Sequence, residues 1–183
     1  AQGQEGTYAT ISGSNLLGGG SEFVSISLNG VEVAETISSG NTEIAVRVAA
    51  LPADSSEGAG DVLLVSDLGA RVSLVNGFAY TRASIINTVT PASGQVGTLV
   101  EIAGDNLLSA TDGTEIVSCL FGDVAQTITG GNSQTTLDVV VQSGAAAAAV
   151  DVRVESDSGA ITTKSAAWQY LAAARITGVS PAY

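Results

Sequence analysis

Short segments in which apolar and polar residues alternate recur along the whole chain. Thr7–Ser12 and Thr98–Ala103 alternate in this way, which is typical of half-buried strands. Further short segments rich in Val, Ile, Thr and Ser follow, and we expect strands at Phe23–Leu28, Val31–Ser38, Glu43–Val48, Asp61–Ser66, Ala70–Tyr80, Ile116–Phe121, Val124–Thr129, Thr136–Val141, Asp151–Ser156 and Ala160–Tyr170. The pattern therefore predicts an all-β protein with about seven strands in each half, the strand content of an immunoglobulin-like β-sandwich.

Turn signals separate these segments. Asn29-Gly30 is a strong hairpin signal, and Gly122-Asp123 stands in the same place in the second half. Residues 67–69 and 157–159 likewise predict a turn before the last strand of each half. Ala145–Ala149 has helical propensity, but it aligns with the loop at residues 52–60, so we expect a loop or the entry to a strand.

The two halves of the chain are copies of one repeat. Residues 3–17 read GQEGTYATISGSNLL and residues 94–108 read GQVGTLVEIAGDNLL. Residues 61–69 and 77–80 match residues 151–159 and 167–170, so the similarity runs to the end of each unit. Because such a repeat marks one structural unit, we expect a first module at residues 1–82 and a second module at residues 83–173.

A third copy begins near the end of the sequence. Residues 86–92 read INTVTPA and residues 176–182 read ITGVSPA, so we expect residues 174–183 to open a third module. Ala1 stands in the same phase as Ala92 and Ala182, and we therefore expect the chain to be a window on a longer array. The linkers at residues 81–85 and 171–175 lack the Gly/Ser composition of a flexible tether. This predicts limited hinge motion, with the Ile-x-x-Val-x-Pro segment packed on the module that follows it.

The repeat motif resembles a known domain family. The pattern I-x-x-V-x-P-x-x-G-x-x-G-T-x-x-x-I-x-G-x-N-L, closed by an aromatic-x-Tyr, is similar to the IPT/TIG domain over both units. The resemblance implies immunoglobulin-like sandwiches. It points to modules found in plexin-type ectodomains, in some transcription factors, beside some starch-acting enzymes and in long surface proteins. It therefore carries an expectation of fold and leaves function open.

Backbone geometry explains the motif positions better than ligand contact does. We expect turns with positive φ at the glycines before the first strand of each unit, which are Gly3, Gly6, Gly94 and Gly97. A bulge or bend is expected after that strand, at Gly13 and Gly104, and side-chain ties to nearby backbone are expected at Asn15 and Asn106. Pro91 and Pro181 mark the openings of the second and third repeats.

Charge and composition restrict the partners. Eighteen acidic residues stand against six basic ones, with a net charge of −12 and no histidine. Such a surface excludes counterion-releasing contacts to nucleic acid and attachment to an anionic membrane. No apolar stretch approaches the length of about 20 residues that a membrane-spanning helix requires, so we expect no direct membrane insertion.

The residues for catalysis or cofactor binding are missing. Without histidine, the usual Ser and Cys triads and His-based acid–base chemistry are excluded, and we expect no enzyme activity and no cofactor. The one cysteine, Cys119, falls inside an alternating strand and is expected to be a buried hydrophobe. Trp168 and Tyr170 align with Phe78 and Tyr80, which predicts core positions rather than a platform for carbohydrate.

Three weaker site hypotheses remain. Calcium would find carboxylates at Asp105, Asp112 and Glu115, although their spacing matches no calcium loop. Tyr183 has no aromatic counterpart in the other units and is a candidate contact to a neighbouring module or chain. Ser and Thr are abundant in predicted loops, and the candidates for O-glycosylation are Ser55, Ser56, Thr135 and Thr136, the last at the start of the strand expected at Thr136–Val141.

These observations favour a structural role. We expect a repeat of an extracellular filament, fibre or surface stalk, built of stiff tandem modules whose partners are neighbouring copies of the same repeat. One alternative is a cell-surface adhesin or receptor ectodomain whose modules bind a protein or glycan. A second alternative is an accessory module of a polysaccharide-acting enzyme.

Overall fold

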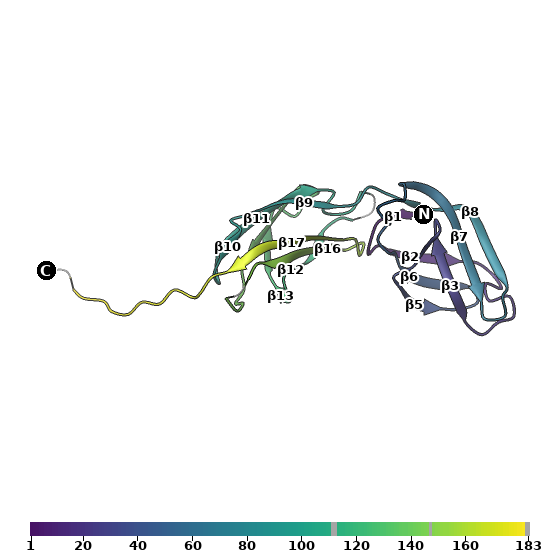
Figure 1. The fold of residues 1–183 in the computed structure, drawn as a ribbon, viewed down its shortest axis with the longest axis horizontal. Helices are drawn as coiled ribbons and strands as arrows, with labels where there is room; N and C mark the ends of the chain where they lie inside the picture. Colours follow the sequence, from purple (N-terminus) through teal and green to yellow (C-terminus); the bar gives the residue numbers. More distant parts are fainter. Residues whose placement is uncertain (111–112, 147, 182–183) are drawn as a thin grey trace.

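The computed structural model describes residues 1–110, 113–146 and 148–181, and every regular element among them is a β-strand. The strands form two sandwiches that follow one another along the molecule (Figure 1). The part of the chain that the structure describes has no helix long and apolar enough to cross a membrane. The all-β, immunoglobulin-like fold predicted from the alternating pattern is therefore confirmed.

The first module is a sandwich of a five-stranded and a three-stranded sheet. The larger sheet has the order β1-β8-β7-β3-β4 and the smaller one β2-β6-β5. The strands are β1 (Gln2–Gly3), β2 (Tyr8–Ser12), β3 (Phe23–Leu28), β4 (Val31–Glu32), β5 (Glu35–Ser39), β6 (Glu43–Arg47), β7 (Gly58–Ser66) and β8 (Arg71–Tyr80).

The second module repeats this arrangement with one more strand. Its sheets have the orders β10-β17-β16-β12-β13 and β14-β15-β11-β9. The strands are β9 (Ile85–Thr90), β10 (Ser93–Gly94), β11 (Leu99–Asp105), β12 (Ile116–Phe121), β13 (Val124–Ala125), β14 (Thr127–Gly130), β15 (Thr136–Val140), β16 (Val150–Ser156) and β17 (Ile161–Tyr170).

One predicted strand in each half is divided between the two sheets. In the first half, β4 pairs with β3 in one sheet, whereas β5 pairs with β6 in the other. The chain changes sheets at Val33 and Ala34, whose backbone N–H groups donate to Ile26 O and Arg47 O. In the second half β13 and β14 divide the predicted strand 124–129 in the same way. Apolar and polar residues go on alternating where the chain passes from one sheet to the other, so the sequence pattern alone predicts a single strand.

Three elements were not predicted as strands. β1 and β10 are two-residue strands that run parallel to the last strand of their module. β9, which includes the Ile-x-x-Val segment, is a full strand paired antiparallel with β11. The prediction that this segment packs on the module that follows it is confirmed, because Ile86 and Val89 belong to the second core. Residues 145, 146, 148 and 149 have no regular structure before β16, while Ala147 lies outside the described residues.

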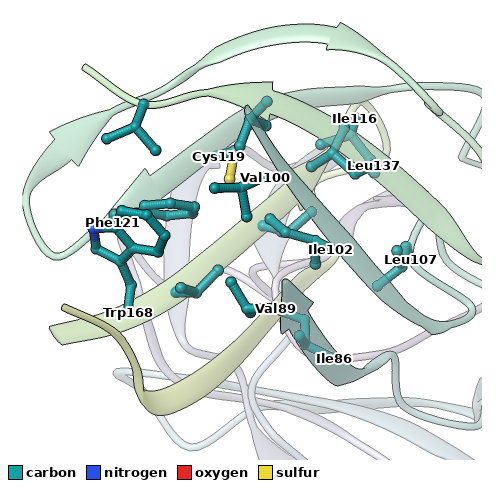
Figure 2. Packing of buried hydrophobic residues seen from close by; sticks show 14 of the residues in the cluster. Ile86, Val89, Val100, Ile102, Leu107, Ile116, Cys119, Phe121, Leu137 and Trp168 are labelled. Carbon is teal, nitrogen blue, oxygen red and sulfur yellow. The ribbon is translucent and has the colours of Figure 1, made fainter. Parts of the chain in front are cut away.

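Each sandwich has its own core. The first centres on Leu28, Ile44, Leu64 and Phe78, and the second on Ile102, Phe121, Leu137 and Trp168 (Figure 2). Cys119 and Trp168 are buried in the second core, as predicted, and Phe121 and Trp168 pack with ring centroids 4.9 Å apart. Burial raises the pKa of the Cys119 thiol to about 12, which leaves the thiol unreactive at neutral pH.

Candidate functional site

Gln4 and Ser84 form a buried hydrogen-bonded clamp where the two modules join. The Gln4 side chain donates through Nε2 to Ser84 Oγ (2.6 Å) and accepts at Oε1 from the Ser84 backbone N–H (3.1 Å). Ser84 O accepts from Thr162 Oγ1 of β17 (3.0 Å), and its hydroxyl donates to Asn106 O. One buried serine of the linker is thus bound by the first module on one side and by the second on the other. This restricts the backbone where a hinge would have to bend.

Direct backbone hydrogen bonds join the ends of the two sandwiches. Tyr8 N–H donates to Ser158 O and Ile161 N–H donates to Glu5 O, both at 3.0 Å. These bonds require the turn before β2 to lie directly against the turn between β16 and β17. The joint therefore consists of main-chain contacts of the kind found within a sheet.

Two glycines allow this approach. Gly6 and Gly159 both have φ of +84°, a conformation that favours glycine. A Cβ at Gly6 would overlap the carbonyl oxygen of Gly159, and a Cβ at Gly159 would lie 2.7 Å from Gly6 O and from the Tyr8 ring. Any larger residue at either position would push the modules apart.

A charged contact completes the joint. Arg47 of β6 forms an ion pair with Glu155 of β16 at 2.5 Å and donates to Gly159 O at 3.4 Å. Its guanidinium lies over the Tyr8 ring, 5.1 Å from the centroid, and Arg153 supports Glu155 from the same strand at 3.1 Å. Because the Arg47 and Glu155 side chains are about one-fifth exposed, salt should screen this pair less than an open surface pair.

The predicted glycine roles need one correction. Gly6 and Gly97 have positive φ, whereas Gly3 and Gly94 do not. Gly3 and Gly94 belong to β1 and β10, where a Cβ would collide with the side chain of the threonine four residues later. They provide room for that threonine, whose hydroxyl accepts from the N–H of Gln4 or Gln95.

The remaining motif positions lie at turns and strand ends. Asn15 and Asn106 have positive φ, at +52° and +55°, in the turns after β2 and β11. The pairing of β9 with β11 shifts register at Gly104, while Gly13 lies directly after β2. Pro91 follows β9 directly, and Pro181 is the last described residue.

The structure does not assemble the calcium candidates into a site. Asp105 accepts a hydrogen bond from Asn87 Nδ2 (3.0 Å) and Glu115 is exposed, while Asp112 lies outside the described residues. Within the residues that the structure describes, no group of three carboxylate, cysteine or histidine side chains is placed to hold a metal ion.

The candidates for O-glycosylation differ in how far their side chains are exposed. Ser55, Ser56 and Thr135 are exposed in loops. Thr136 begins β15, as the predicted strand has it; it is half-buried there and its hydroxyl donates to Gly131 O (3.0 Å). Tyr183 lies outside the described residues.

Sequence reasoning missed the residues of the joint itself. Gln4, Ser84 and Arg47 were not singled out as site residues. A signal for the glutamine was present, since the repeated G-Q-x-G-T motif contains Gln4 and Gln95 in the same place. No local pattern identifies Ser84 or Arg47, because their partners lie 80 and 108 residues away in the chain.

Comparison with known proteins gives a family match to the second module. The model of the IPT/TIG domain matches residues 84–170. No curated protein matches the chain. Three solved structures of low identity are similar to it. The full extracellular region of plexin A4 (20% identity, TM-score 0.48) aligns over 93% of this chain and 15% of its own.

A second structure is SGBP-B of the Bacteroides ovatus mixed-linkage glucan utilization locus, solved with a mixed-linkage heptasaccharide. It has 18% identity and a TM-score of 0.35, and it aligns over 94% of this chain and 42% of its own. The I9–I11 tandem of titin has 13% identity and a TM-score of 0.35, and it aligns over 93% of this chain and 62% of its own. The chain thus spans less than half of the first two proteins. Residues 84–170, the second module of this chain, match the model of the IPT/TIG domain.

Proposed function

We propose that this chain is a structural repeat of an extracellular filament or surface stalk and acts as a stiff spacer without catalytic activity. The observation that carries the proposal is the joint between the modules. There, backbone hydrogen bonds, the Gln4–Ser84 clamp and the Arg47–Glu155 pair bind one sandwich to the next. A joint of this kind transmits orientation along an array, whereas a flexible tether would lose it.

The surface chemistry supports this proposal. The net charge of −12 keeps rods soluble and apart at low salt. The single thiol is buried, so an oxidising medium would leave it unchanged. Neither property requires a ligand, and a spacer needs none.

Imaging the native protein tests this function. Antibodies raised against the 183-residue chain, used for immunogold electron microscopy on intact cells, should decorate straight fibres or stalks outside the cell. Label confined to the cell interior would contradict the proposal, as would label on strings that bend freely at every module.

A further inference from the structure

The modules contact each other through one end of each, and the repeat gives both modules equivalent ends. We call the end of the first module that carries Tyr8 and Arg47 its exit face. The end of the second module that carries Glu155 and Ser158 is its entry face. By the repeat, the second module has an exit face beside β10, and the first has an entry face at the turn between β7 and β8. Figure 1 shows these two faces at opposite ends of the two sandwiches.

The exit faces of the two modules differ in chemistry. On the first module, Tyr8 lies opposite Arg47, where β2 pairs with β6. On the second module, Leu99 lies opposite Val140, where β11 pairs with β15. Where the first exit face presents an aromatic ring and a guanidinium, the second therefore presents two aliphatic side chains.

The entry faces differ in the same direction. The turn between β7 and β8 corresponds in the repeat to the turn between β16 and β17. Val65 of β7 stands at the place of Glu155 in β16. Leu68 stands at the place of Ser158 in the turn. The entry face of the first module is thus aliphatic at the two positions where that of the second module is charged or polar.

The faces in contact are polar on both sides, and the other two faces are apolar at the same positions on both sides. In the joint, Arg47 forms an ion pair with Glu155 and lies over the Tyr8 ring. If the exit face of the second module met the entry face of the first in this geometry, Val140 would stand against Val65. A charged pair would be exchanged for an aliphatic pair, and neither arrangement would leave a charge unpaired.

The backbone geometry of the joint is present in the apolar faces as well. Gly97 and Gly69 have φ of +88° and +80°, close to the values of the two glycines at the existing joint. The main-chain bond from β2 to the turn after β16 has its counterpart at Leu99 and Leu68, and such a bond needs no particular side chain. The two kinds of joint therefore share a backbone arrangement and differ in their side chains.

The hydroxyl groups at the linker follow the same division. In the joint, Ser84 donates to Asn106 O and Thr162 donates to Ser84 O. In the repeat, Ala174 stands at the place of Ser84, and Val72 stands at the place of Thr162. The apolar faces thus lack both hydroxyl groups that the polar joint uses.

One charged residue lies on the apolar faces. Arg71 stands at the place of Ile161, whose side chain approaches Gly6 across the joint. The aliphatic stem of Arg71 can lie over Gly97 in the same way, while its guanidinium reaches water at the rim. The apolar faces can therefore meet without burying an unpaired charge.

Mismatched faces would separate charges from their partners. An exit face like that of the first module, set on an entry face like that of the first, would place Arg47 against Val65. An exit face like that of the second, set on the entry face of the second, would place Val140 against Glu155. Either arrangement leaves a charged side chain without its partner at a place where only about one-fifth of it is exposed, which is unfavourable. Two of the four pairings are therefore favoured over the others.

We propose that these faces set the order of the modules: a polar exit face binds a polar entry face, and an apolar exit face binds an apolar one. Each module thus accepts the other kind as its neighbour. The partner that fits the entry face of the first module is a module with aliphatic side chains at the places of Leu99 and Val140. This rests on the proposed spacer function and names the contacts that would order its modules.

Exchanging face residues within the 183-residue chain tests this pairing rule. The exit variant carries Tyr8→Leu with Arg47→Val. The entry variant carries Glu155→Val with Ser158→Leu, and the combined variant carries all four changes. Every new residue is the one that stands at the equivalent place in the other module, so each module should keep its fold.

Spin labels at Ser38→Cys and Ala125→Cys report the distance between the modules in each variant. The exit and entry variants should each raise the open fraction about fivefold or more, because the ion pair and the cation–π contact are lost. The combined variant should regain the narrow distribution of the unmodified chain, because its faces match again. Effects that simply add in the combined variant would overturn the pairing rule and leave the spacer function standing. A broad distribution in the unmodified chain would instead contradict the spacer function.

Reordering the modules tests the apolar pair of faces directly. In a chain in which residues 83–181 precede residues 1–82, Ala1 follows Pro181 and the repeat stays in phase. The exit face of the second module then precedes the entry face of the first. The same two spin labels should give a narrow distance distribution, and a broad one in a chain with two folded modules would overturn the proposal.

A charge placed on the apolar exit face provides the matched control. In the reordered chain, Val140→Arg should broaden the distribution, and adding Val65→Glu should narrow it again. In the chain with its original order, Val140→Arg should leave the distribution narrow, because Val140 lies at the end away from the joint. Equal effects of Val140→Arg in the two orders would contradict the proposed contact.

Discussion

Replacing Gly6 by alanine should open the joint between the modules, and Gly97→Ala provides a matched control. Gly6 and Gly97 occupy the same place in the repeat and have φ of +84° and +88°. Alanine at either position pays the cost of a left-handed conformation, about 1–2 kcal/mol. At Gly97 nothing lies within reach of the added Cβ, whereas at Gly6 the Cβ meets Gly159 O and the Ile161 side chain.

The difference between the two variants therefore measures the joint. Relieving the overlap requires the turns to separate, which breaks the hydrogen bonds Tyr8 N–H to Ser158 O and Ile161 N–H to Glu5 O. At about 0.5–1.5 kcal/mol for each bond, Gly6→Ala should lose a further 1–3 kcal/mol of coupling between the modules.

Pulsed electron paramagnetic resonance measures this opening directly. Spin labels at Ser38→Cys and Ala125→Cys lie on exposed positions in different modules, and the buried Cys119 does not compete for label. The unmodified and Gly97→Ala backgrounds should give one narrow distance distribution. The Gly6→Ala background should give a broad one. A narrow, unshifted distribution for Gly6→Ala would refute the reasoning and with it the stiff joint.

Three further predictions follow from the same structure. A double-mutant cycle of Arg47→Met and Glu155→Gln should give a coupling of about 1 kcal/mol that falls only modestly with added salt; additive effects would show that the pair does not hold the joint. Phe78→Ala should lower the free energy of unfolding of the first module by about 3–5 kcal/mol. Unfolding of the second module, followed by the fluorescence of the only tryptophan, should shift by less than about 1 kcal/mol, and an equal shift would mean one cooperative unit. A hydrogen bond from the Ser21 hydroxyl lowers the pKa of Asp67, and one from the Thr114 hydroxyl lowers the pKa of Asp157. Their stabilisation is therefore complete above the ordinary carboxyl pKa of 3.8 and is lost as the pH falls through the lowered values. Replacing both by asparagine should flatten the acid limb of the pH–stability curve, and an unchanged limb would contradict this assignment.

The sequence predicted the fold well because the repeat and the alternation are local signals. Phe23–Leu28 and Ile116–Phe121 are strands with the predicted bounds. The crossing at Val33 and Ala34 could not be seen, since which sheet a strand joins depends on partners distant in the chain. β1 and β10 are two residues long, too short for any periodicity.

The candidate site was less predictable because its parts come from both modules. Gln4 and Ser84 are 80 residues apart, and Arg47 and Glu155 are 108 apart. Neither pair has a sequence signature, since an ion pair or amide–hydroxyl contact needs only proximity. The glycines of the repeat were visible, but only the structure shows that Gly6 faces another module while Gly97 faces open space.

The short parallel pairs have a mechanical consequence. β1 runs parallel to β8, and β10 runs parallel to β17, so a short strand near the start of each module lies beside the last strand of that module and points the same way. Tension along the chain would pull the two strands of such a pair in opposite directions along their length. Their hydrogen bonds lie across that direction and would be loaded together in shear rather than opened one at a time. Each of these two pairs should therefore resist tension applied along its strands.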